Sequence, residues 1–276
     1  MKKIMTIVLT VALCLACLFS FGGCSKDELV GVDMYLMELV AEELNMKVEF
    51  YDVDFDSICG KVASEDNAIG AAGITINDER KLTVAFSDPY FSSVQCIISA
   101  AGDAYDELSD LAGKKIGVQK GTTGALMVQE AIESGVLKDT GASVKEYDNG
   151  AIAYTAMKSA ASDACEVIVL DKLPAQKHVS ADPTTYVATD ITGADIEEYG
   201  LAVGKNASNK DAILAAMNKV ISETNMEDVV AYYTSVSNGT EPTVQLDFAD
   251  LSDNTAGTLK VYTCSGFEPY EFIITK

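Results

Sequence analysis

The segment "GTLKVYTCSGFEPYEFIITK", residues 257–276, decides how the rest of the sequence is interpreted. A strand-like apolar run is followed by a glycine-containing turn and a second apolar run, a pattern typical of the opening of a domain. It comes after residues 237–257, which are rich in Ser, Asn, Gly, Thr and Asp and are predicted to form a linker. The C-terminal segment of this sequence therefore has the pattern that is typical of the first segment of a domain.

Upstream of this tail, strand-like and helix-like segments alternate. Asp33 is predicted to cap a helix whose apolar residues follow the three-and-four spacing. Strands are predicted at residues 47–53, 68–76, 94–100, 114–119, 166–171 and 200–206, and amphipathic helices at 211–224 and 226–236. Such alternation predicts parallel strand pairing in an α/β architecture.

The first 23 residues have the pattern of an export signal. Two lysines precede an uncharged apolar run, residues 4–21, which is followed by Gly22, Gly23 and Cys24. The small-small-Cys ending resembles the cleavage box of bacterial lipoproteins, in which Cys24 becomes the lipid-bearing first residue. The alternative is an uncleaved anchor, because roughly 18 apolar residues can just span a bilayer.

The charge of the chain excludes some partners. The formal net charge is −22, and removal of the signal with Lys2 and Lys3 would bring it to −24. An acidic surface of this kind repels phosphate backbones and anionic headgroups. We therefore expect no nucleic-acid partner, and membrane contact only through the anchor.

The cysteines and the single histidine give no support for a metal site. Two cysteines lie in the signal and Cys24 is the predicted anchor, which leaves Cys59, Cys96, Cys165 and Cys264 without the close spacing of a zinc or redox motif. These four could form two disulfides, but their scatter favours free, buried thiols. His178 has no nearby cysteine and no G-x-S-x-G turn accompanies it, so we expect neither a metal nor another cofactor.

Three groups at predicted strand ends could bind a small charged ligand. In "GITINDERK", residues 73–81, Arg80 follows Gly73 and Thr75 by one turn, which suits a carboxylate, although such an arginine is more often solvated. "GTTG", residues 121–124, has the form of an anion cradle at a helix N-terminus or of an ordinary turn. Asp171 ends an apolar run, where open α/β sheets place ligand groups, or it caps the next segment.

Together these motifs resemble one family. "VEFYDVDFDSI", "AAGITINDERKLTVAFSDPYF", "LAGKKIGVQKGTTG" and "EVIVLD" are similar to successive motifs of the polar amino-acid-binding proteins that serve ABC importers. The resemblance implies a type II periplasmic-binding-protein fold, with two lobes that are each a mostly parallel sheet flanked by helices. Lobe 1 would comprise residues 25–98 and 200–276, and lobe 2 residues 99–199, joined by the strands near 96–100 and 199–203.

The resemblance also implies a ligand site between the lobes. Arg80 would hold the ligand carboxylate with the N–H groups of Thr75 and Thr123, and Asp171 would hold the ammonium with the Gly73 carbonyl and the Thr75 hydroxyl. Phe55 would line the side-chain pocket, or belong to the core. The residues expected to bind the ligand are Phe55, Gly73, Thr75, Arg80, Thr122, Thr123, Asp171 and Phe267, with Gln119 and Cys264 as further candidates.

By the same resemblance, the chain is a circular permutant. "ELVGVD", residues 28–33, matches the family's sequence after its first hairpin, and the missing opening reappears at 258–272. The opening strand would lie between residues 47–53 and 68–76, and the break would fall at an exposed hairpin tip. The alternatives are a truncated second copy and a tail swapped into a neighbouring molecule.

The resemblance implies an extracytoplasmic binding protein that captures a free amino acid and passes it to an ABC permease, acting as a monomer. An amino-acid sensor domain and a dehydratase-like enzyme are the alternatives. The pocket lacks an evident general acid, which argues against an enzyme, and Glu268 on the tail is the candidate for that role. Cys264 stands where the family often has Asp, and Leu170 precedes Asp171, so our hypothesis is a neutral ligand.

Overall fold

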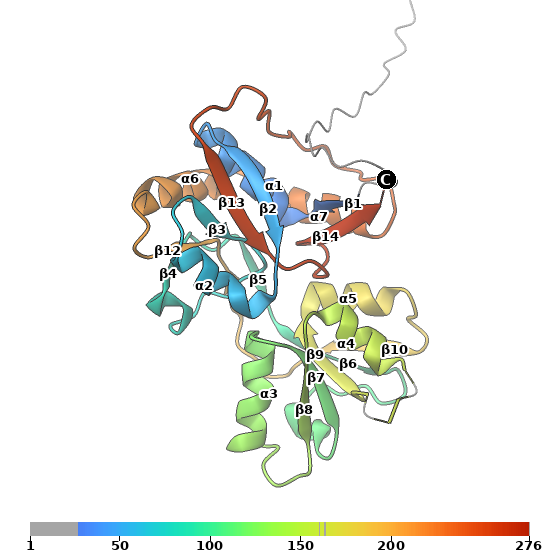
Figure 1. Ribbon diagram of the computed structural model, residues 1–276. Coiled ribbons are helices and arrows are strands. Elements are labelled where there is room, and N and C mark those ends of the chain that lie inside the picture. Colours follow the sequence, from blue (N-terminus) through green and yellow to red (C-terminus); the bar gives the residue numbers. More distant parts are fainter. Residues whose placement is uncertain (1–26, 160, 163, 276) are drawn as a thin grey trace, which may run out of the picture.

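The computed structural model describes residues 27–159, 161–162 and 164–275, which form two lobes, one above the other in Figure 1. The predicted export signal and Cys24 lie outside the described residues. Each lobe has a five-stranded sheet with helices packed against it. The two-lobed α/β architecture predicted from the sequence is confirmed.

The sheet of lobe 1 combines strands from distant parts of the chain. Its order is β2 (Lys47–Asp52), β13 (Thr258–Thr263), β3 (Ala68–Gly70), β12 (Ala202–Gly204) and β4 (Val84–Phe86). The helices of this lobe are α1 (Val32–Glu43), α2 (Ile58–Ala63), α6 (Lys210–Glu223) and α7 (Met226–Ser237), with the short 3-10 helices η1 (Phe55–Ser57) and η2 (Arg80–Leu82).

Lobe 2 is built from one continuous part of the chain. Its sheet has the order β10 (Tyr186–Asp190), β6 (Gln95–Ala100), β9 (Val167–Asp171), β7 (Lys115–Gln119) and β8 (Ser143–Tyr147). Its helices are α3 (Thr123–Glu133), α4 (Gly150–Met157) and α5 (Lys172–Ser180), with the 3-10 helix η3 (Leu108–Leu111).

Two small antiparallel pairs complete the fold. Strand β5 (Phe91–Ser93) pairs with β11 (Glu197–Tyr199) where the chain crosses between the lobes, so we call these two strands the hinge. Strand β1 (Asp27–Val30) pairs with β14 (Phe272–Thr275), which brings the two ends of the described chain together.

Several details of the prediction are wrong. The sheets are mixed rather than mostly parallel, because β12 and β6 each run antiparallel to both of their neighbours. The strand predicted at 68–76 ends at Gly70. The first boundary between the lobes was predicted between residues 98 and 99. It lies before residue 95, because all of β6 belongs to the sheet of lobe 2.

Strand β13 lies where the tail was predicted to lie, between β2 and β3 of the same chain. Val261 pairs in parallel with Phe50 on one side and with Ile69 on the other. The side chains of Leu259 and Val261 are fully buried, as the position of β13 in the middle of the sheet requires. In Figure 1 this red strand stands beside the blue strand β2.

Residues 238–257 connect α7 to β13 along the outside of lobe 1, and side-chain contacts hold them there. Phe248 packs edge-on against the ring of Tyr35. The buried amide of Asn254 donates to the carbonyl oxygens of Ala41 and Met46, at 3.3 and 2.8 Å. The predicted linker is therefore attached to lobe 1 rather than free of it.

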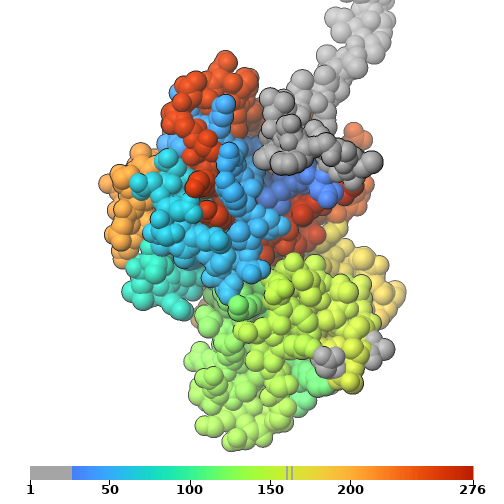
Figure 2. Space-filling view, in the orientation of Figure 1, coloured from blue at the N-terminus to red at the C-terminus, as the bar shows by residue number. Residues whose placement is uncertain are grey.

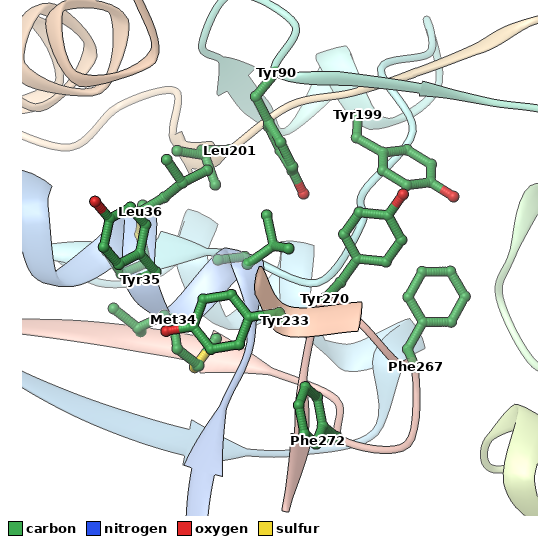
Figure 3. Packing of buried hydrophobic residues seen from close by; sticks show 14 of the residues in the cluster. Met34, Tyr35, Leu36, Tyr90, Tyr199, Leu201, Tyr233, Phe267, Tyr270 and Phe272 are labelled. Carbon is green, nitrogen blue, oxygen red and sulfur yellow. The ribbon is translucent and has the colours of Figure 1, made fainter. Parts of the chain in front are cut away.

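Aromatic residues of the tail complete the core next to the hinge. Tyr270 packs edge-on against Tyr199 of β11 and against Phe91 of β5, with ring centroids 5.3 and 5.4 Å apart. Figure 3 shows Tyr199, Tyr270 and Phe267 in succession on one side of this cluster. The tail therefore supports the hinge as well as the sheet.

Asp33 does not cap α1, contrary to the prediction. The N-cap residue is Gly31, and the Asp33 side chain, which is fully buried, turns into the core. Its carboxylate accepts hydrogen bonds from Gly73 N at 2.8 Å and from the Tyr90 hydroxyl at 2.7 Å. Burial raises the pKa of Asp33 to about 7.

Substitution of Asp33 tests this buried contact. Asp33→Ala leaves two buried donors without an acceptor and should lower the free energy of unfolding by about 3 kcal/mol, measured by urea denaturation. In the wild type, the raised pKa of Asp33 makes the free energy of unfolding depend on pH. The contribution of Asp33 is fully present below pH 3.8 and is lost as the pH rises through about 7. Asp33→Asn should therefore lose less stability than wild type between pH 5 and pH 8. An unchanged pH dependence would contradict this account.

Cys59, Cys96, Cys165 and Cys264 are free, which agrees with the prediction. No helix in the described part of the chain has both the length and the apolar composition needed to cross a membrane.

Candidate functional site

A small cavity lies between the lobes, beside the hinge. Eleven residues line it: Phe55, Ala72, Gly73, Thr75, Arg80, Gln119, Thr122, Thr123, Asp171, Phe267 and Glu271. The cavity has a volume of about 10 Å³, which is room for about one water molecule. The lobes are therefore closed on each other, and a larger ligand requires them to separate.

The predicted site residues converge on this cavity. All eight residues of the main set line it, and so does Gln119. Cys264 is not one of the lining residues, but it is in contact with one, because the amide nitrogen of Gln119 lies 3.7 Å from its Sγ. Ala72, Glu271 and the acidic residue Glu197, described below, were not predicted.

Arg80 reaches across the cleft. From lobe 1 its guanidinium donates to the carbonyl oxygen of Thr75 at 2.8 Å and to that of Gly121, in lobe 2, at 3.1 Å. The same group lies over the ring of Phe55, 5.3 Å from the centroid. These contacts show that Arg80 is not a solvated surface residue, and its remaining N–H groups are available to an anion.

The turn after β3 brings backbone groups to the cavity. Gly73 has a φ of +54°, and a Cβ on it would come within 2.6 Å of the Phe267 ring. Only glycine allows this backbone conformation and this close approach together. The turn therefore places the Gly73 and Thr75 backbone beside the cavity and against the tail.

Asp171 supplies a buried acid from lobe 2. It ends β9 and occupies the N-cap position of α5, but its side chain makes no capping hydrogen bond. Instead Oδ1 accepts a 2.6 Å hydrogen bond from the hydroxyl of Tyr199. Burial, followed by the nearby carboxylate of Glu197, raises the pKa of Asp171.

Helix α3 begins at the cavity, and its two threonines have different partners. Thr122 is the N-cap residue: its hydroxyl accepts from Ala125 N at 3.1 Å and donates to the carbonyl of Gln119 at 2.8 Å. This hydroxyl is therefore engaged within lobe 2. The Thr123 hydroxyl instead points toward lobe 1, 3.5 Å from that of Thr75.

Glu197 joins both lobes from the hinge. Its Oε2 accepts hydrogen bonds from the hydroxyls of Thr75 in lobe 1 and Thr123 in lobe 2, both at 2.8 Å. Gln95 donates to its Oε1 at 3.2 Å. Because both hydroxyls donate their hydrogen atoms to Glu197, their oxygen lone pairs can accept hydrogen bonds from a donor group in the cleft.

Two further contacts connect the lobes away from the cavity. Lys120 forms a 2.7 Å ion pair with Asp56 at the mouth of the cleft, and Lys177 of α5 donates to the carbonyl of Ser237 at the end of α7 at 2.6 Å. Figure 2 shows the two lobes in direct contact with each other. An exposed ion pair such as that of Lys120 and Asp56 contributes little free energy, so we expect the buried contacts around the cavity to matter more for the closed form.

The chain belongs to the bacterial extracellular solute-binding proteins, family 3, whose sequence model matches residues 18–233. The match ends before β13 and β14, so the tail lies outside it. The fold is that of the two-lobed periplasmic binding proteins.

Individual relatives agree with this assignment. The arginine-binding extracellular protein ArtP of Bacillus subtilis is 30% identical over 73% of this chain and 74% of its own length. The glutamine-binding protein GlnH of the same organism's ABC transporter is 30% identical over 77% of this chain and 75% of its own.

A solved structure, that of an ancestral arginine-binding protein bound to arginine, is similar with a TM-score of 0.61 and 37% identity. The match covers 71% of this chain and 82% of the ancestral protein.

The role of the Glu197 contacts in closing the lobes can be tested by measuring the dimensions of the protein in solution. Glu197→Gln replaces a charged acceptor with a neutral amide and should weaken two hydrogen bonds that hold the lobes together. We expect small-angle X-ray scattering to give a larger radius of gyration for this variant than for wild type. Glu198→Gln is the matched control, because Glu198 is the exposed neighbour on the same strand. Equal dimensions for both variants would exclude a closing role for Glu197.

Proposed function

We propose that this protein captures a free α-amino acid between its lobes and delivers it to an ABC permease. The observation that carries the proposal is that Arg80, from lobe 1, and Asp171, from lobe 2, line one closed cavity. Arg80 is suited to the α-carboxylate, because a guanidinium can hold a carboxylate with two parallel hydrogen bonds. Asp171, the Gly73 carbonyl and the Thr75 hydroxyl are suited to the α-ammonium.

The permease can recognise the closed conformation of the two lobes. A ligand held by Arg80 on one side and Asp171 on the other makes all its contacts only in the closed form, so binding shifts the population toward that form. Closure about a hinge is a common response of two-lobed proteins to a ligand. Phe55, Thr122, Thr123 and Phe267 would enclose the ligand.

Binding without turnover is the better interpretation of the site. The named relatives are binding proteins. Glu268, the acid that could have served a dehydratase-like reaction, does not line the cavity. A sensor domain on the same scaffold remains the second candidate, and it would use the same closure to signal rather than to deliver.

We further propose an extracytoplasmic monomer anchored by lipid on Cys24. Support comes from the family, which is one of extracellular proteins, and from the small-small-Cys pattern of the sequence. Metabolic labelling with a palmitate analogue, compared between wild type and Cys24→Ala, would test the anchor.

The sequence offers one hypothesis for the side chain of the ligand. The hypothesis of a neutral amino acid rests on Cys264 and Leu170, which offer no charge. It takes no account of Glu271, which lines the same cavity. Relatives are named for both kinds of ligand: ArtP for arginine and GlnH for glutamine.

We propose that the order of the segments arose by circular permutation. Support comes from β13, which fills the middle of the sheet, and from the family match, which ends at residue 233. Strands β1 and β14 pair as the two arms of a hairpin whose tip is the break. The residues after Ser237 would then be the linker that joins the former ends.

Reordering the chain tests the permutation. A variant that places residues 258–275 before residue 27 through a short glycine-rich turn, and ends after Ser237, should fold with the circular dichroism spectrum of the wild type. It should also bind the same ligand, because the strand order in space is unchanged. Loss of structure would show that residues 238–257 are needed for more than connection.

Substitutions at the two charged groups test the ligand proposal. Arg80→Lys and Asp171→Asn should each weaken amino-acid binding by about 10-fold to 100-fold, because each removes hydrogen bonds to a charged group. Calorimetry with the twenty amino acids measures this, and thermal unfolding confirms that the variants fold. The proposal fails if the wild type binds none of the twenty, or if both variants bind as it does.

A further inference from the structure

A second acid, Glu271, faces the cavity from the tail. Its side chain is 1% exposed, and it lines the cavity together with Phe55 and Phe267. The loop that carries it is closed by hydrogen bonds from Gly266 N and Phe267 N to the Glu271 carbonyl. Its position is therefore fixed, yet Oε2 of the carboxyl group, buried as it is, has no hydrogen-bond partner.

The ionisable groups that act on Glu271 are also acidic. They come from three elements: Asp33 from α1, Asp52 from β2, and Glu268 and Cys264 from the tail itself. Asp33 and Asp52 have partners of their own, in Tyr90 and Ser265. The ionisable groups that act most strongly on Glu271 include no lysine or arginine.

Arg80 does not fill this role. Its guanidinium is held by the carbonyls of Thr75 and Gly121 and lies over Phe55. In the proposed function it is assigned to the α-carboxylate of the ligand. Acids therefore prevail among the groups that act most strongly on Glu271, and Glu271 is the one of them that lines the cavity.

An isolated buried carboxylate is costly, so without a partner the group keeps its proton. Burial, followed by the neighbouring acids, raises the pKa of Glu271 well above its ordinary value. A cation placed against Oε2 would supply both the missing hydrogen-bond donor and the missing charge. The walls beside it are aromatic, and aromatic rings also favour cations and their aliphatic stems.

We propose that Glu271 is the specificity-determining residue of the cleft, and that the ligand is an amino acid whose side chain ends in a positive charge, a guanidinium or an ammonium. This inference rests on the proposed function and replaces the hypothesis of a neutral ligand. Cys264, where the family often has Asp, does not then leave the pocket uncharged, because Glu271 provides the acid from seven residues further along the same tail.

The exchange of charges has a measurable consequence. When the cationic side chain binds, the carboxyl O–H bond of Glu271 breaks and its proton passes to the buffer, leaving a carboxylate paired with the ligand. Asp171 releases its proton to the buffer in the same way when any amino acid binds, because every amino acid carries the α-ammonium group. A cationic ligand should therefore release more protons than a neutral one.

The test is calorimetry of the full chain with arginine, lysine and glutamine, in two buffers of different ionisation enthalpy at one pH. The wild type should bind arginine or lysine more tightly than glutamine and release more protons with the basic ligand. Glu271→Gln should weaken the basic ligand by at least about 10-fold, abolish the additional proton release, and change glutamine binding little. Glu268→Gln, which removes an acid of the same loop that does not line the cavity, should keep the wild-type preference.

The outcomes separate the two proposals. Binding of glutamine or another neutral amino acid without binding of arginine or lysine would overturn this inference and leave the proposed function in place. Unchanged arginine and lysine binding by Glu271→Gln would also overturn it. If that variant does not fold, the comparison of proton release between basic and neutral ligands in the wild type decides. Binding of no amino acid at all would remove the proposed function and this inference with it.

Discussion

The hydrogen-bonded position of β13 between β2 and β3 is the constraint on which the rest of the molecule depends. Without this strand, two rows of backbone N–H and C=O groups would face each other unpaired in the middle of lobe 1. The same segment carries Phe267, Tyr270 and Glu271 to the cavity and the hinge. One pairing therefore completes the sheet, the hinge packing and one wall of the site.

Tyr199 shows how closely these parts are connected. It lies in the hinge strand β11 and packs against Tyr270 of the tail. Its hydroxyl donates to Asp171, the acid that lobe 2 contributes to the cavity. Movement of the hinge thus changes the surroundings of Asp171 directly, and a group bound at Asp171 acts directly on the hinge. Closure and binding are linked through a few adjacent side chains.

Local patterns in the sequence were sufficient to predict the alternation of elements. The place of β13 and most of the residues around the cavity were predicted from the resemblance to the amino-acid-binding proteins. The prediction failed where the orientation of a side chain decides. Asp33 lies in the first turn of a helix, where acids usually cap or face solvent, but it turns inward to Gly73 and Tyr90. Glu197 and Glu271 were missed for a related reason, since "IEEYG" and "PYEF" do not show which acid is buried.

The directions of the strands could not be predicted from the sequence either. An alternating pattern predicts parallel pairs, but β6 and β12 follow the two crossings between the lobes and return antiparallel to their neighbours. The excess of acidic groups around Glu271 could be recognised only when Asp33, Asp52 and Glu271 were placed together in space.

The position of β13 also determines the order in which the molecule can be assembled during translation. The strands of lobe 2 lie between residues 95 and 190 and are complete once that stretch has been synthesised. Lobe 1 must wait for residues 258–275, and it then closes a contact between Asp27 and Thr275, almost the full length of the chain. Contacts between residues so distant in sequence form slowly. Lobe 1 therefore stays incompletely folded until residues 258–275 have been synthesised, whereas the sheet of lobe 2 can form before them.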